Sequence, residues 1–201
     1  MGKGLLLVVS GPAGSGKSTV NGIVCQTPGF VRAVSATSRA PRKGEADGVN
    51  YYYVSRERFE EMIEQDLFLE HTEFCTNYYG SLKSELEKIN TGVNVIFEIE
   101  VEGAMNVRKL YPDAILIMLL PPSYSEQEKR LRGRNSETEE SIANRLARTK
   151  VELEYLPNYD YIVYNETNGA DRAAEQILAI ARAEQSSVRR NPEAKEIYLA
   201  N

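Results

Sequence analysis

Gly11-Pro12-Ala13-Gly14-Ser15-Gly16-Lys17-Ser18 fits the phosphate-loop pattern G-x-x-x-x-G-K-[ST], and the rest of the 201-residue chain is organised around it. A short apolar run at 5–9 precedes the loop and is typical of a buried parallel strand. The residues at 18–26 can continue as a helix. Because the pattern needs strand, glycine loop and helix in that order, these flanks favour a phosphate site over a simple glycine turn.

The residue types in this loop suit a nucleoside triphosphate. Glycines let the backbone curl so that successive N–H groups point at one anion, and the helix N-terminus adds its positive end. Lys17 is then expected to reach the β- and γ-phosphates, while Ser18 offers its hydroxyl to Mg²⁺.

Composition narrows the class of protein. Hydrophobic residues make up 42% and charged residues 26% of the chain, which is globular composition with enough apolar surface for a core. The net charge of -5 argues against a broad nucleic-acid or membrane surface. Cys25, Cys75 and the single His71 lack metal-ligand spacing and indicate reduced thiols in a cytoplasmic protein. No apolar run reaches membrane-span length, and the start leaves no room for a signal peptide.

Hydrophobic patterning predicts alternating strands and helices. Strands are expected at 30–35, 51–54, 68–74, 93–100, 114–120 and 160–165, and helices at 56–65, 82–90, 103–110, 123–132, 136–155 and 170–184. Ser55 is the expected cap of the first of these helices, a capping box at Ser136 and Glu139 opens the long one, and 77–81 is expected to be a turn.

This alternation predicts an α/β fold in which helices flank a parallel sheet. The stretch 36–92 breaks the alternation, so we interpret it as an inserted, mixed α/β lobe. The predicted nucleotide-binding core is then 1–35 together with 93–201, and it includes a helical lid at about 126–155.

A second anion site is suggested by the basic, turn-rich segment after Ser35. Arg39 and Arg42 are three residues apart, close to Tyr51, and Tyr79 lies in a second turn-like stretch. Two guanidinium groups and two phenol hydroxyls suit a phosphate dianion. A solvated surface is the alternative for two neighbouring arginines taken alone.

With these residues in view, the chain resembles the guanylate kinases over nearly its whole length. The resemblance is carried by the phosphate loop, by Ser35-x-Thr37-Ser38-Arg39-x-x-Arg42-x-x-Glu45-x-x-Gly48-x-x-Tyr51, by Glu70, by Asn77-Tyr78-Tyr79-Gly80-Ser81, and by Arg130-x-x-Gly133-Arg134 leading to Arg145. The pattern at 35–51 is the most specific of these.

The resemblance implies a phosphate-loop nucleoside monophosphate kinase with a GMP-binding lobe and a mobile lid. Such an enzyme transfers the γ-phosphoryl group of ATP to GMP or dGMP in purine metabolism, with Mg²⁺ as cofactor. Its partners are then these small substrates, with no nucleic acid and no membrane, and the chain can equally be a monomer or a homo-oligomer.

Roles carry over to the matching positions. For ATP, the resemblance implies contacts at Gly11, Pro12, Ala13, Gly14, Ser15, Gly16, Lys17, Ser18, Thr19, Arg130 and Asn165. For GMP, it implies guanine contacts at Ser35, Glu70 and Ser81, and phosphate contacts at Arg39, Arg42, Tyr51 and Tyr79 supported by Glu45. For catalysis, it implies Lys17, Arg39, and the lid arginines Arg134 and Arg145.

Three carboxylates depart from the family pattern. The family usually has two aspartates at the end of the central strand and a glutamine before the following glycine, where this chain has Glu98, Glu100 and Glu102. We expect Glu98 and Glu100 to keep a place on the GMP side, with Glu98 also acting on the Mg²⁺ of Ser18 through water. Ser38 stands where threonine is usual.

Three alternatives remain at this point. A kinase for another small phosphate disagrees with Glu70 and Ser81, which match a guanine site. A non-catalytic guanylate-kinase-like interaction module disagrees with the intact Gly16-Lys17-Ser18. A phosphate-loop GTPase or nucleic-acid translocase disagrees with the missing N-K-x-D run and with the acidic charge.

Overall fold

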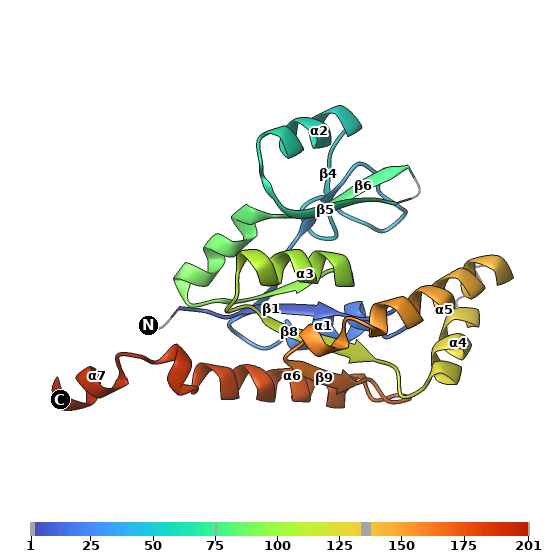
Figure 1. Cartoon of the computed structure of the whole chain (residues 1–201). Coiled ribbons are helices and arrows are strands. Elements are labelled where there is room, and N and C mark those ends of the chain that lie inside the picture. Colours follow the sequence, from blue (N-terminus) through green and yellow to red (C-terminus); the bar gives the residue numbers. More distant parts are fainter. Residues whose placement is uncertain (1–2, 75, 134–137, 201) are drawn as a thin grey trace.

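The structure is a computed structural model that describes residues 3–74, 76–133 and 138–200. Its larger sheet has five parallel strands in the order β2-β7-β1-β8-β9 (Figure 1). The strands are β1 (Leu6–Ser10), β2 (Phe30–Arg32), β7 (Asn94–Glu98), β8 (Ile115–Leu120) and β9 (Tyr161–Tyr164). This confirms the predicted α/β class with a parallel sheet.

Strand β1 lies at the centre of this sheet and is buried on both faces. Successive side chains of a strand point to opposite faces. Leu7 and Val9 therefore pack against α1 (Lys17–Val24) and α6 (Ala170–Gln185). Leu6 and Val8 pack on the other face, against α3 (Val101–Leu110) and the 3₁₀-helix η1 (Lys83–Thr91). Figure 1 shows α3 and α6 on opposite sides of the sheet.

The smaller sheet has the strand order β4-β3-β6-β5 and carries its own apolar cluster. Its strands are β3 (Ser35–Thr37), β4 (Tyr52–Tyr53), β5 (Phe68–Phe74) and β6 (Asn77–Leu82). Helix α2 (Arg56–Glu64) covers it, with the predicted Ser55 cap accepting from the Arg58 N–H at 3.1 Å. The Phe59 ring stacks on Phe68 and Tyr78, with centroids 4.3 and 5.1 Å apart.

One turn prediction and one strand prediction were wrong, and tertiary pairing explains both. The segment 77–81 is not a turn, because it lies in β6 and pairs with β3 on one side and β5 on the other. The segment 30–35 is not one strand, because β2 pairs with β7 in the larger sheet whereas β3 pairs in the smaller one. The chain passes from one sheet to the other between Arg32 and Ser35.

Two predicted helices also differ in detail. The helix expected at 82–90 is the 3₁₀-helix η1, which ends at Gly92 with φ of 83°. The long helix is α5 (Glu139–Leu153), and Thr138 caps it by accepting from the Ser141 N–H at 3.2 Å. The cap is therefore two residues later than predicted, and Ser136 lies outside the described residues.

The remaining helical elements complete the fold. They are α4 (Tyr124–Arg132), η2 (Leu156–Asn158), η3 (Val188–Arg190) and α7 (Ala194–Ala200). Within the described ranges, no helix combines the length and apolar character that crossing a membrane requires.

Gly80 has no room for a side chain in β6. A Cβ there would lie 2.6 Å from Phe68 Cδ1 and 3.0 Å from Phe59 Cζ. We expect Gly80→Ala to lower the free energy of unfolding by about 1–3 kcal/mol, because the stacked rings must move. Urea unfolding measures this change.

Gly22→Ala is the matched control, because nothing lies within 4 Å of a Cβ at this exposed position of α1. That variant should gain up to about 1 kcal/mol from helix propensity. Equal stability of Gly80→Ala and the parent chain would contradict the packing described for the smaller sheet.

Candidate functional site

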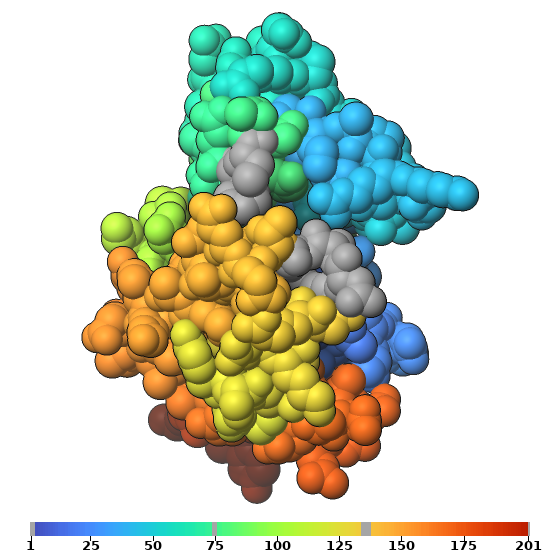
Figure 2. Space-filling view, turned by 90° about the vertical axis from the view of Figure 1, so that its right-hand side faces the viewer, coloured from blue at the N-terminus to red at the C-terminus, as the bar shows by residue number. Residues whose placement is uncertain are grey.

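A cavity of about 950 Å³ lies where the carboxyl end of the larger sheet faces the smaller sheet and α5. Figure 2 views the molecule from the side of α4 and α5 (yellow to orange), with the smaller sheet and α2 above them. The cavity brings together Lys17 of the phosphate loop, Ser35 and Glu70 of the smaller sheet, Glu98 of β7 and Arg145 of α5. Residues from four separate parts of the chain therefore share one space.

The phosphate loop is held from outside by Asn165. Gly16 has φ of 88°, and a Cβ there would lie 2.3 Å from the Asn165 amide nitrogen. That nitrogen donates to the Ser15 carbonyl at 2.8 Å. Glycine at this position thus serves both the left-handed backbone and the close approach of Asn165.

Lys17 lies back across the loop that carries it. Its Nζ donates to the Gly11 carbonyl at 2.5 Å and to the Pro12 carbonyl at 3.4 Å. The ammonium is therefore held at the mouth of the loop, where the neighbouring N–H groups favour an anion.

Ser18 and Glu98 meet beside Lys17. The Ser18 hydroxyl donates to Glu98 Oε1 at 2.5 Å, and the Asn21 amide donates to Oε2 at 3.1 Å. Pairing of β1 with β7 sets Val9 opposite Glu98 and so brings the carboxylate to the loop. A hydroxyl and a carboxylate are hard oxygen donors, which suit Mg²⁺ held partly by water and phosphate. Elsewhere in the described ranges, no cluster of three His, Cys, Asp or Glu could hold a metal.

A second hollow of about 360 Å³ lies outside the loop, next to Gly14, Gly16 and Thr19. Arg130 and Asn165 line it. The Arg130 guanidinium donates to the Asn165 carbonyl at 2.9 Å and to Glu126 at 3.0 Å. The two predicted ATP contacts that lie far apart in sequence are therefore in direct contact.

Arg39 is held by Glu45 and by tyrosine rings. Its Nη2 donates to both Glu45 carboxylate oxygens at 3.0 and 2.9 Å. Its guanidinium carbon lies 5.7 Å from the Tyr51 centroid, and the Tyr51 ring meets the Tyr79 ring edge-on at 5.9 Å. The four predicted residues form one cluster, while Arg42 contributes its backbone N–H and keeps an exposed side chain.

The Glu45 carboxylate is surrounded by donors. The Arg42 N–H, the Tyr53 hydroxyl and Arg39 all donate to it, and together they lower the pKa of Glu45 to about 2. Tyr53 was not predicted from sequence. The sequence feature that could have identified it is the alternation of side chains along a strand, which puts residues 51 and 53 on the same face.

The predicted guanine contacts form a row across three strands. Strand pairing sets Ser35 opposite Ser81, and Ser81 opposite Glu70. The Ser81 hydroxyl donates to Glu70 at 2.7 Å and lies 3.4 Å from the Ser35 hydroxyl. Burial raises the pKa of Glu70, and the hydrogen bonds from Ser81 oppose that effect. Gly103 of α3 leaves space for the carboxylate, because a Cβ there would lie 2.9 Å from Glu70 Oε2.

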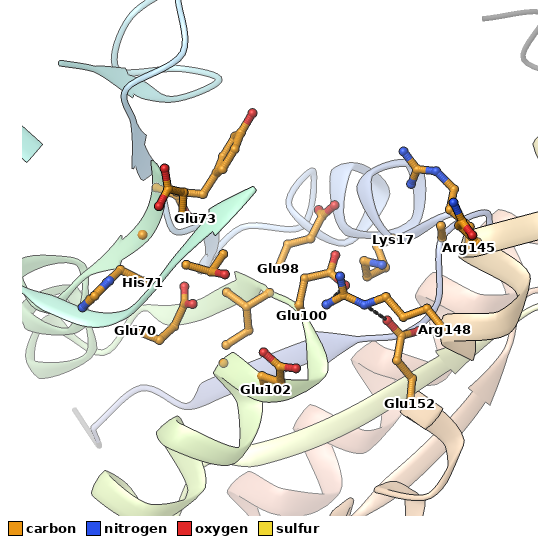
Figure 3. A pocket seen from close by; sticks show the side chains of 18 of the residues that line it. Lys17, Glu70, His71, Glu73, Glu98, Glu100, Glu102, Arg145, Arg148 and Glu152 are labelled. Carbon is orange, nitrogen blue, oxygen red and sulfur yellow. Dashed lines mark hydrogen bonds and ion pairs between the residues drawn. The ribbon is translucent and has the colours of Figure 1, made fainter. Parts of the chain in front are cut away.

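The α5 side of the cavity carries arginines. Figure 3 shows Arg145 and Arg148 reaching in from α5, with Arg148 between Glu100 and Glu152. Arg148 lies 3.0 Å from Glu152 and 3.9 Å from Glu100. Sequence reasoning did not find Arg148, whose only signals are its three- and four-residue spacings from Arg145 and Glu152. Arg134, the other predicted lid arginine, lies outside the described residues.

Comparison with known proteins gives a consistent result. A family model described as guanylate kinase matches residues 3–184. The chain is 47% identical to a guanylate kinase of Halalkalibacterium halodurans over 90% of this chain and 89% of that protein. It is 44% identical to one of Desulfitobacterium hafniense over 94% of each. Its fold is similar to the crystal structure of guanylate kinase from Anaplasma phagocytophilum, with a TM-score of 0.78 and 30% identity, covering 98% of this chain and 94% of that one.

Glu45 should stay ionised at unusually low pH. Its lowered pKa, about 2, means that its bond to Arg39 is complete at neutral pH and is lost only as the pH falls through that value. We expect the Glu45 carboxyl carbon shift to remain that of a carboxylate at pH 4, measured by ¹³C NMR. Glu57→Gln and Glu45→Gln spectra identify the resonances, and a Glu45 midpoint near 4.5 would contradict the donor arrangement.

Proposed function

This chain belongs to the guanylate kinase family and phosphorylates GMP with ATP, and we propose from its geometry which residues carry out each part of that reaction. The observation that supports this assignment of roles is that Lys17 and Glu98 line the same cavity as Glu70 and Ser35. A phosphate loop lies at one end of the cavity, and the row of Ser35, Ser81 and Glu70 lies at the other. This arrangement suits two nucleotides bound with their phosphates toward each other.

We assign the phosphates of ATP to the loop at 11–19. Lys17 exchanges the carbonyls of Gly11 and Pro12 for phosphate oxygens. Ser18 and Glu98 are the residues that would hold Mg²⁺, which when bound neutralises charge on the β- and γ-phosphates. The adenine lies in the hollow bordered by Arg130 and Asn165.

We assign the phosphate of GMP to Arg39, Arg42, Tyr51 and Tyr79. The hydrogen bonds that Arg39 donates to Glu45 fix its guanidinium before substrate arrives, so little side-chain freedom is lost on binding. Strand pairing fixes the position of Tyr79 in the same way, because it lies directly opposite Thr37 in the smaller sheet, while Tyr51 lies just before β4 in a bridge with Asp47.

The guanine base is assigned to the row of Ser35, Ser81 and Glu70. Guanine presents N1–H and N2–H₂ as adjacent donors, and one carboxylate accepts from both. The Ser35 and Ser81 hydroxyls, which contact each other and Glu70 in this structure, turn to donate to O6 or N7 when the base binds. Adenine has an unprotonated N1 in the same place and leaves the carboxylate without a donor, which rejects it strongly.

Transfer itself needs positioning and charge stabilisation rather than a protein nucleophile. We propose that α4 and α5 form the lid and that Arg145, with Arg134 beyond the described residues, closes over the transferring phosphoryl group. Closure excludes water that otherwise hydrolyses ATP. Glu100, at the start of α3, lies on the GMP side of this space.

The finer parts of the assignment are also proposals. We include dGMP as a substrate, Mg²⁺ as the metal that accompanies ATP, and the cytoplasm and purine metabolism as the setting. Cys25 is half-buried with a free thiol, and Cys75 lies outside the described residues.

The base assignment is tested with Glu70→Gln. We expect the parent enzyme to use GMP and dGMP and to reject AMP, UMP and CMP in a coupled ADP-release assay. The variant should lose at least about 100-fold in kcat/KM for GMP, because two hydrogen bonds to a charged group are lost, and its GMP/AMP ratio should collapse.

Glu61→Gln is the control, since Glu61 lies on α2 outside the cavity, is exposed and pairs with Arg58. It should keep the GMP/AMP ratio of the parent. A folded Glu70→Gln enzyme with an unchanged ratio would show that Glu70 does not read the base.

The phosphate assignment is tested with Arg39→Ala. Loss of a charge-assisted hydrogen bond worth roughly 1.5–3 kcal/mol should weaken GMP binding by about 10- to 100-fold, with ATP binding changed by less than about twofold. Calorimetry with each nucleotide measures both. Arg58→Ala, which breaks only a surface pair with Glu61, is the control. Equal losses for ATP and GMP would mean that Arg39 holds another phosphate.

A further inference from the structure

The carboxylate that fixes Arg39 is itself tied to the smaller sheet at one point. Glu45 lies in the loop between β3 and β4 and receives bonds from Arg39 and from the Arg42 N–H, both in the same loop. The remaining partner that the described structure gives Glu45 is Tyr53, whose hydroxyl donates to Oε2 at 2.9 Å. Without Tyr53, the partners of Glu45 among the described residues all come from its own loop, and the carboxylate reaches the smaller sheet only through Arg39, which contacts the Tyr51 ring.

Tyr53 itself has a fixed position. It lies in β4, paired in parallel with β3 so that it stands beside Thr37. Its N–H donates to the Asp47 side chain at 2.9 Å, and the next N–H, that of Val54, donates to the Thr37 carbonyl at 3.0 Å. The phenol therefore extends toward Glu45 from an anchored backbone.

The Tyr53 ring also contacts the arginine that Glu45 orients. The Arg39 guanidinium carbon lies 5.8 Å from the Tyr53 centroid, and the Tyr53 and Tyr51 rings meet at 6.0 Å and 62°. Arg39 is largely buried, with 14% of its side chain exposed. Tyr53 thus acts on Arg39 in two ways, through its ring face and through the hydroxyl bond to Glu45.

We propose that Tyr53 is a positioning residue for the GMP phosphate: its hydroxyl ties Glu45, and through Glu45 the Arg39 guanidinium, to the smaller sheet. This rests on the proposed assignment of Arg39 to that phosphate. Glu45 Oε2 accepts three donors, Arg39, the Arg42 N–H and Tyr53, at 2.9, 2.7 and 2.9 Å. Loss of one leaves the carboxylate able to rotate, and GMP must then order Arg39 as it binds.

Tyr53→Phe tests the hydroxyl alone, because the ring and its contacts with Arg39 and Tyr51 remain. We expect the KM for GMP to rise about threefold to tenfold, less than for Arg39→Ala, because the lost hydrogen bond acts on the phosphate only through Glu45 and Arg39. The kcat and the KM for ATP should change by less than about twofold, since neither depends on this tie. Steady-state kinetics with each nucleotide varied in turn measures all three.

Tyr52→Phe is the matched control. It makes the same chemical change one residue away, but Tyr52 packs against the apolar cluster of the smaller sheet that contains Phe59 and Phe68. Its kinetic constants should equal those of the parent. A similar rise in the KM for GMP in this variant would mean that any loosening of the sheet has the effect, and would overturn the specific role of Tyr53.

A second readout separates positioning from general stability. Because the Tyr53 hydroxyl helps to lower the pKa of Glu45 from 4.5 to about 2, Tyr53→Phe should raise it, measured by ¹³C NMR on the folded enzyme. An unchanged KM for GMP in Tyr53→Phe, with Arg39→Ala still impaired, would overturn this proposal alone. An unchanged KM in Arg39→Ala as well would overturn the phosphate assignment on which it rests.

Discussion

Parallel pairing of β1 with β7 and β8 governs where chemistry can occur in this protein. Because the carboxyl ends of parallel strands meet at one edge, the loop after β1 and the carboxylate that ends β7 are adjacent. The short bond between Ser18 and Glu98 follows from that pairing and joins residues 80 positions apart. The strands are buried on both faces, so the edge of the sheet is rigid. The loops attached to this edge are therefore held in fixed positions.

Two arginines in and beside the cavity of this acidic chain are each paired with a carboxylate. Glu45 orients Arg39, and Glu152 orients Arg148. These pairs restrict long side chains that would otherwise lose much freedom on binding. Overall charge is therefore a poor guide to such a site, because what matters is the placement of a few donors around each phosphate.

The smaller sheet connects the residues proposed to recognise the base to the core. Its row of Ser35, Ser81 and Glu70 runs across three paired strands, so small changes in register would separate the three groups. Gly103 lies at the start of α3 and lets that helix approach the Glu70 carboxylate. A helix of the core and a strand of the smaller sheet therefore meet at the residue assigned to the base.

The sequence by itself was sufficient for the phosphate loop, the buried central strands and the cap at Ser55, because each of these depends on neighbours within a few residues. It also identified, through a motif, most of the residues that now line or border the cavity. Their roles stay predictions until the variants are measured.

Only the tertiary structure decided which segments pair and which side chains support the site. The segment 77–82 contains glycine, asparagine and serine and looks like a turn, yet it is a strand because β3, some 40 residues earlier, and β5 both pair with it. Gly80 is needed there for the Phe59 and Phe68 rings rather than for a bend. The contacts of Tyr53 and Arg148 were found only in the structure for the same reason. Hydrogen bonds and ion pairs depend on the distance between side chains in space, which local sequence patterns do not specify.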